Sequence, residues 1–458
     1  MKMKILHYSL GLPPYRTGGL TKYSYDLMNE EAKIGNHIIL LYPGHFTVNP
    51  KIKIIGNGRK NNIYVYEIIN PLPVPLLGGI GKSQLFNKKC EIKVYYEFLK
   101  KIKPDIIHIH TLMGLHKEFI EAAKELDIKM LYTTHDYFGI CPKVNLLDYK
   151  YEICKNYDKG EKCSICNQNS YSLKLIYLMQ SKFYRNIKES NLIKVLRKYK
   201  KENLNGNKSV DDFNKKISLT NAEDYVRLRN YYFSMFKEIN YFHFNSSTSE
   251  NIYKHYINDI NGKVINITHS DIGDKRELKR FDPKKSLKIL YLGPIDNYKG
   301  FYLLKRSLDR LLIEGNNNWH LDVYGDNKTI FNSEYIKVNG KYNYKQLSTI
   351  FKKTDVIIIP SIWKETFGFT GLEALSYGVP IITTDNVGFN DLIINNKTGF
   401  IIKPNEAELK EKLELIIDNR NILADINKNI INMDFNFTMD KHVNKMINLY
   451  NSVIEGSY

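Results

Sequence analysis

The sequence predicts an α/β protein built from two doubly wound domains. Its 458 residues are too many for one ordinary hydrophobic core and fit two domains of about 200 residues each. Both halves alternate short apolar runs with helical patterns, which is typical of parallel strands connected by helices. In the first half, strands over 4–9 and 38–42 flank a helix over 20–34. In the second half, residues 287–292 and 356–359 are apolar runs typical of strands buried on both faces.

The domain boundary is expected in a charged stretch near the middle of the chain. We assign residues 1–270 to the first domain and residues 280–435 to the second. The last helix, within residues 438–458, is expected to cross back onto the first domain.

Composition indicates a soluble protein in a reducing compartment. Hydrophobic residues make up 43% of the chain and charged residues 25%, which is ordinary for a globular protein. We find no secretory signal and no apolar run of the ~18 residues that could span a bilayer. We therefore expect a cytoplasmic location and reduced thiols.

One stretch, residues 355–380, carries the strongest functional signal. It reads as a strand over 356–359, a loop, and a helix from Thr366 to Tyr377. Glu365 and Glu373 stand eight residues apart, so both carboxylates can face one side of this element and accept hydrogen bonds from vicinal hydroxyls. The amides of Phe367 and Gly368 at the expected helix start would attract phosphate.

These features together suit a sugar nucleotide. The alternative is that Glu365 only caps the helix and Glu373 lies on a solvated face, because acidic pairs at helical spacing are common.

The longer string resembles the signature of glycosyltransferase family 4. The resemblance rests on Pro360-Ser361-x-Trp363-x-Glu365-x-Phe367-Gly368, then Glu373-Ala374 and Gly378-Val379-Pro380. It implies the GT-B fold, in which two Rossmann-like domains face each other across a cleft. It also implies transfer of a sugar, with retention of configuration, from a nucleoside diphosphate sugar to a glycan or lipid-linked acceptor, as in cell-surface polysaccharide assembly. Catalysis would need no divalent metal.

The resemblance also assigns roles along the chain. Glu365 would hold the sugar hydroxyls and Glu373 the ribose. Gly18 and Gly19 would form the loop whose amides meet the diphosphate.

In the second domain, Gly293 and Lys299 would bind the same group, with Lys299 stabilising the departing phosphate. Pro294 stands where the family often has an arginine, and Arg16 or Lys364 would have to substitute for it.

His135 is the histidine that the resemblance singles out as an active-site residue. Strands over 105–110 and 129–134 end in His110 and in His135-Asp136, and ligands of doubly wound sheets bind at such strand ends. Family members carry His-Asp at this place, facing the sugar. A packed structural histidine is the alternative.

Four cysteines follow closely, at Cys141, Cys154, Cys163 and Cys166. In a reducing compartment this cluster predicts a structural zinc site with four sulfur ligands and no open coordination position. Only the last pair has the usual two-residue spacing, so four unliganded thiols remain the alternative.

The positive charge is concentrated in the first domain. Residues 1–270 hold 41 Lys and Arg against 25 Asp and Glu, while residues 271–458 hold 26 against 24. Residues 171–201 are both basic and apolar, which predicts docking on an anionic membrane surface from the cytoplasmic side. A helix that packs on the domain with solvated lysines and a site for an anionic soluble glycan are the alternatives. No nucleic-acid-binding signature is present.

Two other function classes compete with the transferase. A sugar-nucleotide epimerase would have a related two-domain fold but lacks the Glu365–Glu373 signature. A non-catalytic sugar-nucleotide-binding protein would not need both glutamates together with Lys299.

Overall fold

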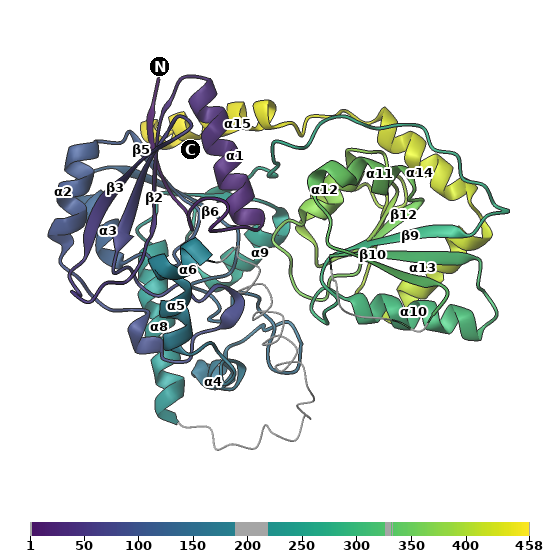
Figure 1. The fold of residues 1–458 in the computed structure, drawn as a ribbon, viewed down its shortest axis with the longest axis horizontal. Coiled ribbons are helices and arrows are strands. Elements are labelled where there is room, and N and C mark those ends of the chain that lie inside the picture. The colour runs from purple at the N-terminus through teal and green to yellow at the C-terminus, as the bar shows by residue number, and fades with distance from the viewer. Residues whose placement is uncertain (1, 188–218, 326–330, 332, 458) are drawn as a thin grey trace. The chain divides into compact units, whose positions relative to one another are not determined.

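The computed structural model describes residues 2–187, 219–325, 331 and 333–457, and the side chains of 219–221 are outside this description. The chain divides into two compact units. Unit 1 comprises Met1–His243, Tyr253–Lys263 and Met446–Tyr458, and unit 2 comprises Phe244–Ile252 and Val264–Lys445. Each unit is built on its own sheet (Figure 1).

Unit 1 is organised on an eight-stranded sheet with the order β3-β4-β2-β1-β5-β6-β7-β8. The pairs from β4 through β7 are parallel, whereas β3 runs antiparallel to β4 at the edge. Strands β1, β2, β5, β6 and β7 are almost wholly buried because apolar side chains cover both of their faces. The strands are β1 (Lys4–Tyr8), β2 (His37–Pro43), β3 (Lys53–Lys60), β4 (Ile63–Ile69), β5 (Ile106–Ile109), β6 (Lys129–Thr133), β7 (Tyr241–Phe244) and β8 (Gly262–Val264).

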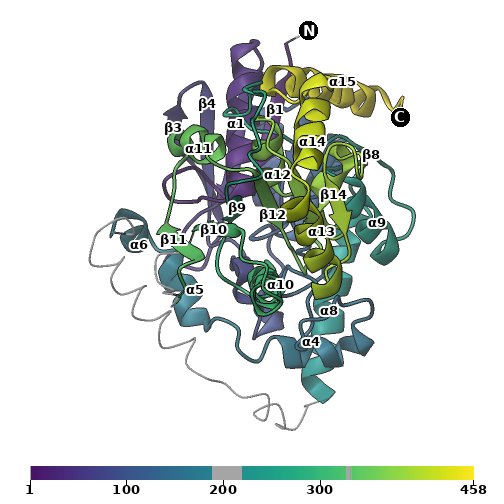
Figure 2. The ribbon, with the colours of Figure 1, turned by 90° about the vertical axis from the view of Figure 1, so that its right-hand side faces the viewer.

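The helices of this half connect and cover those strands. They are α1 (Gly19–Lys33), α2 (Ile92–Ile102), α3 (Lys117–Glu125), α4 (Glu161–Cys166), α5 (Leu173–Met179), α6 (Lys182–Ile187), α8 (Leu219–Phe236) and α9 (Ser247–Tyr256). Helix α15 (Met439–Glu455) returns to this unit, and Figure 1 and Figure 2 both place it beside α1. The contact is specific, because the Tyr450 hydroxyl donates a hydrogen bond of 2.7 Å to the buried Glu31 carboxylate on α1.

Unit 2 is organised on a six-stranded sheet with the order β11-β10-β9-β12-β13-β14, and all its pairs are parallel. The strands are β9 (Leu287–Leu292), β10 (Trp319–Tyr324), β11 (Ile336–Gly340), β12 (Val356–Ile359), β13 (Ile381–Thr384) and β14 (Phe400–Ile402). Helices lie on both faces: α10 (Phe301–Ile313), α11 (Leu347–Lys352), α12 (Phe369–Leu375), α13 (Glu406–Asp418) and α14 (Asn421–Asn432). Both views place α10 beside α13, with α11 and α12 on the other side of the sheet in Figure 1.

Each sheet has a switch point where the strand order reverses. In unit 2 it lies between β9 and β12, and in unit 1 between β1 and β5. Ligands of such sheets bind beyond the carboxyl ends of the strands at this point. The loops that follow these four strands are therefore the places to look for a site.

The division between the units differs from the expected boundary at residue 270. Residues 244–252 and 264–270 belong to unit 2. The physical reason is local contact: the Ser247 amide donates to Asp391 at 2.8 Å, and the His269 ring lies 5.0 Å from the Phe369 ring.

Within the described ranges, every helix is too short or too polar to pass through a lipid bilayer.

Candidate functional site

The loop after β9 is held directly against the end of β12. Gly300 has a φ of 74°, and a Cβ added there would lie 1.7 Å from the Pro360 carbonyl oxygen, so only glycine fits. The amide of Ile362 donates to the Tyr298 carbonyl at 3.0 Å, which ties the two loops together again. The Lys299-Gly300 turn is thereby fixed beside the residues that follow β12.

Lys299 and Glu365 meet at this junction. The Lys299 ammonium lies 2.7 Å from Glu365 Oε1, and the Ser361 hydroxyl donates to Glu365 Oε2 at 3.2 Å. The two side chains are 24% and 17% exposed, so they form a pair at the edge of the sheet that solvent and ligands can reach. The ammonium also lies 5.1 Å from the centre of the Trp363 ring.

The helix after this loop begins later than the sequence predicts. It spans Phe369–Leu375 rather than Thr366 to Tyr377, because Gly368 takes a φ of 94° and residues 365–367 are extended against the chain at 386–389. The Glu365 amide donates to the Asn386 carbonyl at 2.8 Å, and the Phe389 amide donates to the Phe367 carbonyl at 2.7 Å. Glu365 therefore lies on an extended segment, and the Phe367 side chain is buried in the core.

Glu373 lies inside α12 and is only 4% exposed. Its Oε1 atom lies 3.3 Å from Nε2 of the buried His269. Burial, with the Glu373 charge second, raises the pKa of the nearby Tyr342. The alternative of a solvated Glu373 is therefore wrong. The sequence analysis missed His269 because it lies at the expected end of the first domain, directly before the charged linker. The signal available there was its position after an apolar run.

Gly293, the other glycine predicted to meet a diphosphate, follows β9 directly. Its amide donates to the Tyr324 carbonyl at 2.8 Å, and a Cβ on the facing Gly325 would lie 2.7 Å from the Gly293 carbonyl oxygen. Because neither glycine has a side chain, the backbone segments that follow β9 and β10 can lie in direct contact.

In unit 1, the paired glycines lie at the start of α1. Gly18 caps the helix with a φ of 117°, and no atom stands within 4 Å of where its Cβ would be. Arg16, two residues earlier, is 8% exposed, and its Nε and Nη2 atoms have no hydrogen-bond partner among the described residues.

His135 follows the carboxyl end of β6 and is half-buried. Its Nε2 atom lies 3.2 Å from Nδ1 of His110, the histidine that follows β5, so the structure brings the two together. Burial holds the pKa of both imidazoles well below the usual range, which keeps them neutral at pH 7. Burial also raises the pKa of the adjacent Asp136 to about 6.

The four predicted zinc ligands line one small cavity of about 20 Å³. No three of their sulfur atoms lie within 4.8 Å of one another. In the described ranges, the one such group of donor atoms is formed by His7, His108 and His110. Arg229 lines the same cavity and is 4% exposed. Its Nη2 atom lies 3.5 Å from Cys163 Sγ, while its Nη1 atom has no hydrogen-bond partner in the part of the chain that the structure describes.

The predicted basic segment at 171–201 is described only to residue 187, and Lys194, Arg197, Lys198 and Lys200 lie outside the described residues. The described part forms two short helices, α5 and α6. Arg185 on α6 does not contribute to a basic surface, because its guanidinium reaches inward to the buried Glu67 at 2.7 Å. Leu178 and Phe183 are 50% and 67% exposed.

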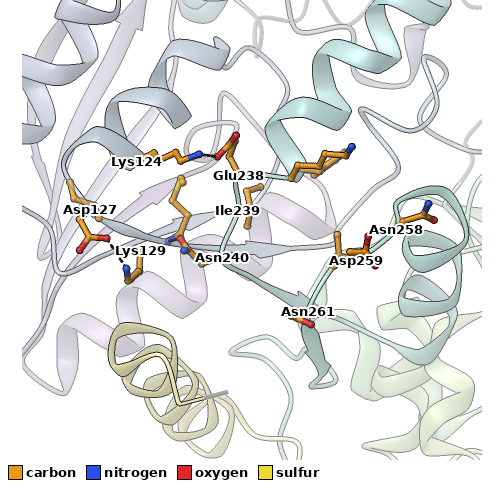
Figure 3. Close-up of a pocket in the computed structure, with 14 residues that line it drawn as sticks. Lys124, Asp127, Lys129, Glu238, Ile239, Asn240, Asn258, Asp259 and Asn261 are labelled. Atoms are coloured by element: carbon orange, nitrogen blue, oxygen red, sulfur yellow. Dashed lines mark hydrogen bonds and ion pairs between the residues drawn. The ribbon is translucent and has the colours of Figure 1, made fainter.

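A pocket of about 510 Å³ in unit 1 lies elsewhere (Figure 3). It opens at the amino ends of β6 and β7, opposite the end of β6 that carries His135. Four of the charged side chains that line it form ion pairs, Lys124 with Glu238 and Lys129 with Asp127. It does not belong to the candidate site.

Solved structures of similar architecture define the class of fold. Sucrose-phosphate synthase from Thermosynechococcus elongatus superposes with a TM-score of 0.57, covering 99% of this chain and 100% of that one at 13% identity. HepE from Anabaena, solved with UDP and glucose, gives a TM-score of 0.55 with 98% and 100% coverage at 13% identity. At such identities the likeness shows the fold alone, and the fold is GT-B, as predicted.

Sequence comparison matches part of the chain to a family. Residues 274–433, which are less than half of the chain, match the family described as "Glycosyl transferases group 1". The capsular polysaccharide biosynthesis glycosyltransferase CapM of Staphylococcus aureus is 29% identical over 149 residues, which cover 30% of this chain and 39% of the relative. A galactosyltransferase of Escherichia coli acting on GlcNAc-diphosphoundecaprenol is 32% identical over 105 residues, 23% of this chain and 27% of that one. These curated relatives are thus matched over well under half of their length.

Proposed function

We propose that the protein transfers a hexose-type sugar from a nucleoside diphosphate sugar to a glycan or lipid-linked acceptor, with retention of configuration. The observation that carries the proposal is the Lys299–Glu365 pair at the switch point of unit 2. A cation and a carboxylate 2.7 Å apart match the two parts of a sugar nucleotide, its phosphates and its hydroxyls.

The pair also gives a role to each residue in the reaction. Without donor, the two charges neutralise each other. When a diphosphate is bound, the Lys299 ammonium would turn to the phosphates and stabilise the charge that develops as they depart. Glu365 would then accept hydrogen bonds from the sugar hydroxyls, and Glu373 from the ribose. Arg16 or Lys364 would supply the phosphate contact for which Pro294 has no cation.

In the transfer step, the bond between the anomeric carbon and the phosphate oxygen breaks as the acceptor oxygen bonds to the same face. The acceptor proton passes to the departing phosphate. His135, at the strand end of unit 1, would contact the sugar. No step in this scheme requires a divalent ion.

Relatives support the substrate classes. HepE was solved with UDP-glucose, and the Escherichia coli relative acts on a lipid-linked diphosphate acceptor. CapM is named for capsular polysaccharide biosynthesis. A role in cell-surface polysaccharide assembly is therefore the one we propose.

The test begins with the donor. Purified protein is screened by thermal shift against UDP-, GDP-, ADP- and dTDP-sugars, and the best ligand is then assayed for sugar transfer to lipid-linked and oligosaccharide acceptors. We expect one nucleotide to stabilise the protein and its sugar to be transferred with the anomeric configuration kept. Interconversion of the donor without an acceptor would favour an epimerase, and binding without turnover would favour a non-catalytic protein.

We also propose that Cys141, Cys154, Cys163 and Cys166 hold one structural zinc ion. Four thiolates around Zn²⁺ carry a net charge of −2, and the buried Arg229 guanidinium beside Cys163 would balance part of it. Closing the site requires the sulfurs to approach to about 3.8 Å, the edge of a tetrahedron with Zn–S bonds of about 2.3 Å.

We further propose that the segment containing α5 and α6 docks on an anionic membrane. Exposed Leu178 and Phe183 would enter the interface, and the lysines and arginines of residues 188–201 would face the lipid charge at about 1 kcal/mol each. Liposome sedimentation tests this: binding should require anionic lipid, weaken with salt, and drop when Lys194, Arg197, Lys198 and Lys200 become Glu or when Phe183 becomes Ser. Binding that ignores lipid charge would contradict the proposal.

A further inference from the structure

Two arginines of unit 1 each have one edge of the guanidinium group that makes no hydrogen bond. Arg16 lies in the loop after β1, and Arg185 lies on α6. In both side chains the atoms concerned are Nε and Nη2, which are buried and have no hydrogen-bond partner among the described residues. This edge of a guanidinium can donate two parallel hydrogen bonds to two oxygens of one anion.

The two guanidinium groups lie in the same neighbourhood, around two tyrosine rings. Each guanidinium carbon lies 4.6 Å from the centre of the Tyr15 ring. Arg185 also lies 5.5 Å from the centre of the Tyr42 ring. A Cβ on Gly11 would lie 3.4 Å from the Tyr42 ring and 3.5 Å from Cγ of Arg16, so Arg16 passes beside the same ring. Contact with a ring face uses the charge of a guanidinium rather than its N–H donors.

The carboxylate beside Arg185 is already saturated by donors. Glu67 is 1% exposed, and its Oε1 accepts a hydrogen bond of 2.6 Å from His45 Nδ1. Its Oε2 accepts from the Tyr42 hydroxyl at 2.6 Å, from Asn57 Nδ2 at 2.9 Å and from Arg185 Nη1 at 2.7 Å. A carboxylate has about four acceptor sites, so these four donors fill it. Glu67 therefore balances one positive charge and has no site left for a second guanidinium.

Arg16 has no counter-charge within the described ranges. Its side chain is 8% exposed, and its guanidinium forms no ion pair with a carboxylate there. Burial lowers the pKa of Arg16, and the positive charge of Arg185 adds to this effect. The guanidinium nevertheless stays protonated, and a buried charge without a counter-charge is destabilising. An anion bound between the two arginines would remove this cost.

The arginines lie at the edge of the sheet that also carries His135. Arg16 follows β1, while Tyr42 and Glu67 are close to the carboxyl ends of β2 and β4. These strands run parallel to one another and to β6, which His135 follows. Strands β1 and β6 are two strand spacings apart in the sheet, which is about 10 Å. A ligand held by the arginines can therefore extend along this edge toward His135.

We propose that Arg16 and Arg185 bind a phosphoryl group of the acceptor. This rests on the function proposed above and specifies the acceptor as a sugar that carries a phosphate or diphosphate, either free or attached to a lipid. Four N–H donors on two edges match a group with three or more oxygens, whereas a carboxylate has two oxygens and occupies one edge. The donor phosphate contact beside Pro294 is then left to Lys364.

Binding can be observed at the arginines themselves. The whole protein is labelled with ¹⁵N-arginine, and the Nε–H signals of Arg16 and Arg185 are assigned by substitution with Lys and followed by NMR. We expect both signals to shift, with saturation, on titration with glucose 1-phosphate or with GlcNAc-diphosphoundecaprenol in micelles. The probe that binds more tightly identifies a soluble or a lipid-linked source. Methyl glucoside and glucuronate should leave both signals in place.

Two results of this titration would overturn the inference. One is that neither phosphorylated probe shifts the two signals, and the other is that methyl glucoside or glucuronate shifts them as strongly. The titration of the wild type is independent of enzymatic activity.

Arg16→Gln separates a binding role from a structural one. Because Arg16 has no ion pair to lose, we expect a Tm no lower than that of the wild type, while affinity for the better probe falls about 10- to 150-fold. Lys182→Gln, which removes an exposed charge from α6, is the matched control and should bind like the wild type. Arg185→Gln should lose affinity and also lower the Tm, because Glu67 loses a donor. Unchanged affinity in Arg16→Gln would count against the proposal.

Kinetics then separates this inference from the proposed function. With the identified donor, Arg16→Gln should raise KM for the phosphorylated acceptor and leave kcat and the donor KM close to those of the wild type. A raised donor KM with an unchanged acceptor KM would overturn the inference and assign Arg16 to the donor phosphates. A protein without transferase activity whose arginines still bind the probe would refute the proposed function and leave the anion site in place.

Discussion

The candidate sites of the two units are built in different ways. In unit 2, the side chains that matter come from one contiguous stretch, 360–373, together with the turn at Lys299. In unit 1, His135 contacts His110, which contacts His7, and these histidines lie on or directly after three separate strands. The first kind of site leaves a motif in the sequence, whereas the second exists only once the sheet has formed. The predictions below test whether the two units respond as differently as this construction implies.

Loss of the zinc ligands should have the largest effect, and it should be confined to unit 1. Structural zinc contributes on the order of 10 kcal/mol to zinc-finger peptides. Cys163→Ser/Cys166→Ser should lose the metal and open the loop around α4, seen as lost protection in hydrogen exchange. Unit 2 should keep its protection.

Elemental analysis provides the control. Wild type and Cys90→Ser, whose thiol is outside the cluster, should each hold about one zinc per chain. Zinc-free wild type, purified from cells with ample zinc, would rule out the site.

Glu365→Gln should abolish most turnover while the nucleotide still binds. Removing one group that stabilises a transition state costs about 10²- to 10³-fold in kcat. Glu411→Gln, at an exposed position of the same unit, is the matched control and should behave as wild type. Steady-state kinetics with the identified donor measures both. Full activity in Glu365→Gln would remove Glu365 from the site.

Glu373→Gln should mainly weaken nucleotide affinity. A charge-assisted hydrogen bond contributes about 1.5–3 kcal/mol, which corresponds to about 10- to 150-fold in Kd. Calorimetric titration with the nucleoside diphosphate measures the change. If Glu373→Gln leaves Kd unchanged but lowers kcat, Glu373 contacts the sugar rather than the ribose, and the roles assigned to Glu365 and Glu373 must be exchanged.

Acid should destabilise unit 1 through its buried histidines. Burial lowers the pKa of His108, His110 and His135 in the folded state, so below about pH 6.5 the unfolded state binds more protons. The free energy of unfolding should fall with decreasing pH, by about 1.4 kcal/mol per pH unit for each such histidine. Asp136 has the opposite effect. Its pKa is raised to about 6 in the folded state, so as the pH falls its carboxylate takes up a proton in the folded state before it does so in the unfolded state.

Urea unfolding between pH 7.5 and 5.5 measures the slope. His108→Asn should reduce it by about 1.4 kcal/mol per pH unit. The exposed His37→Asn should leave it unchanged. Equal slopes in all three proteins would mean that the buried rings are protonated in the folded state.

Much of the fold could be predicted because parallel strands buried on both faces are continuous apolar runs. Strands β9 and β12 begin and end at the residues the sequence indicates. The predicted start of α12 was wrong. The residues expected to form its first turn are extended and pair with residues 386–389. A local sequence pattern does not reveal such a pairing between two separate segments.

The site in unit 1 could be predicted only in part. His135 was predicted from the resemblance of the sequence to glycosyltransferase family 4 and from its position directly after a strand. Glu31 was missed because its partners are His7, 24 residues earlier, and Tyr450, more than 400 residues later. One signal was available: His7 and His108 interrupt apolar strands, and a polar side chain in such a run needs a buried partner.

The contact of Tyr450 with Glu31 has a consequence for biosynthesis. Ribosomes make the chain from residue 1 onward, so most of unit 1 is synthesised before unit 2. Yet Tyr450, which is fully buried in unit 1 against Glu31 and His108, is added only after all of unit 2 has been translated. Until then the Glu31 carboxylate lacks the hydrogen bond that Tyr450 donates, and α15 does not yet cover this part of unit 1. The half of the protein that is begun first is therefore the half that is completed last.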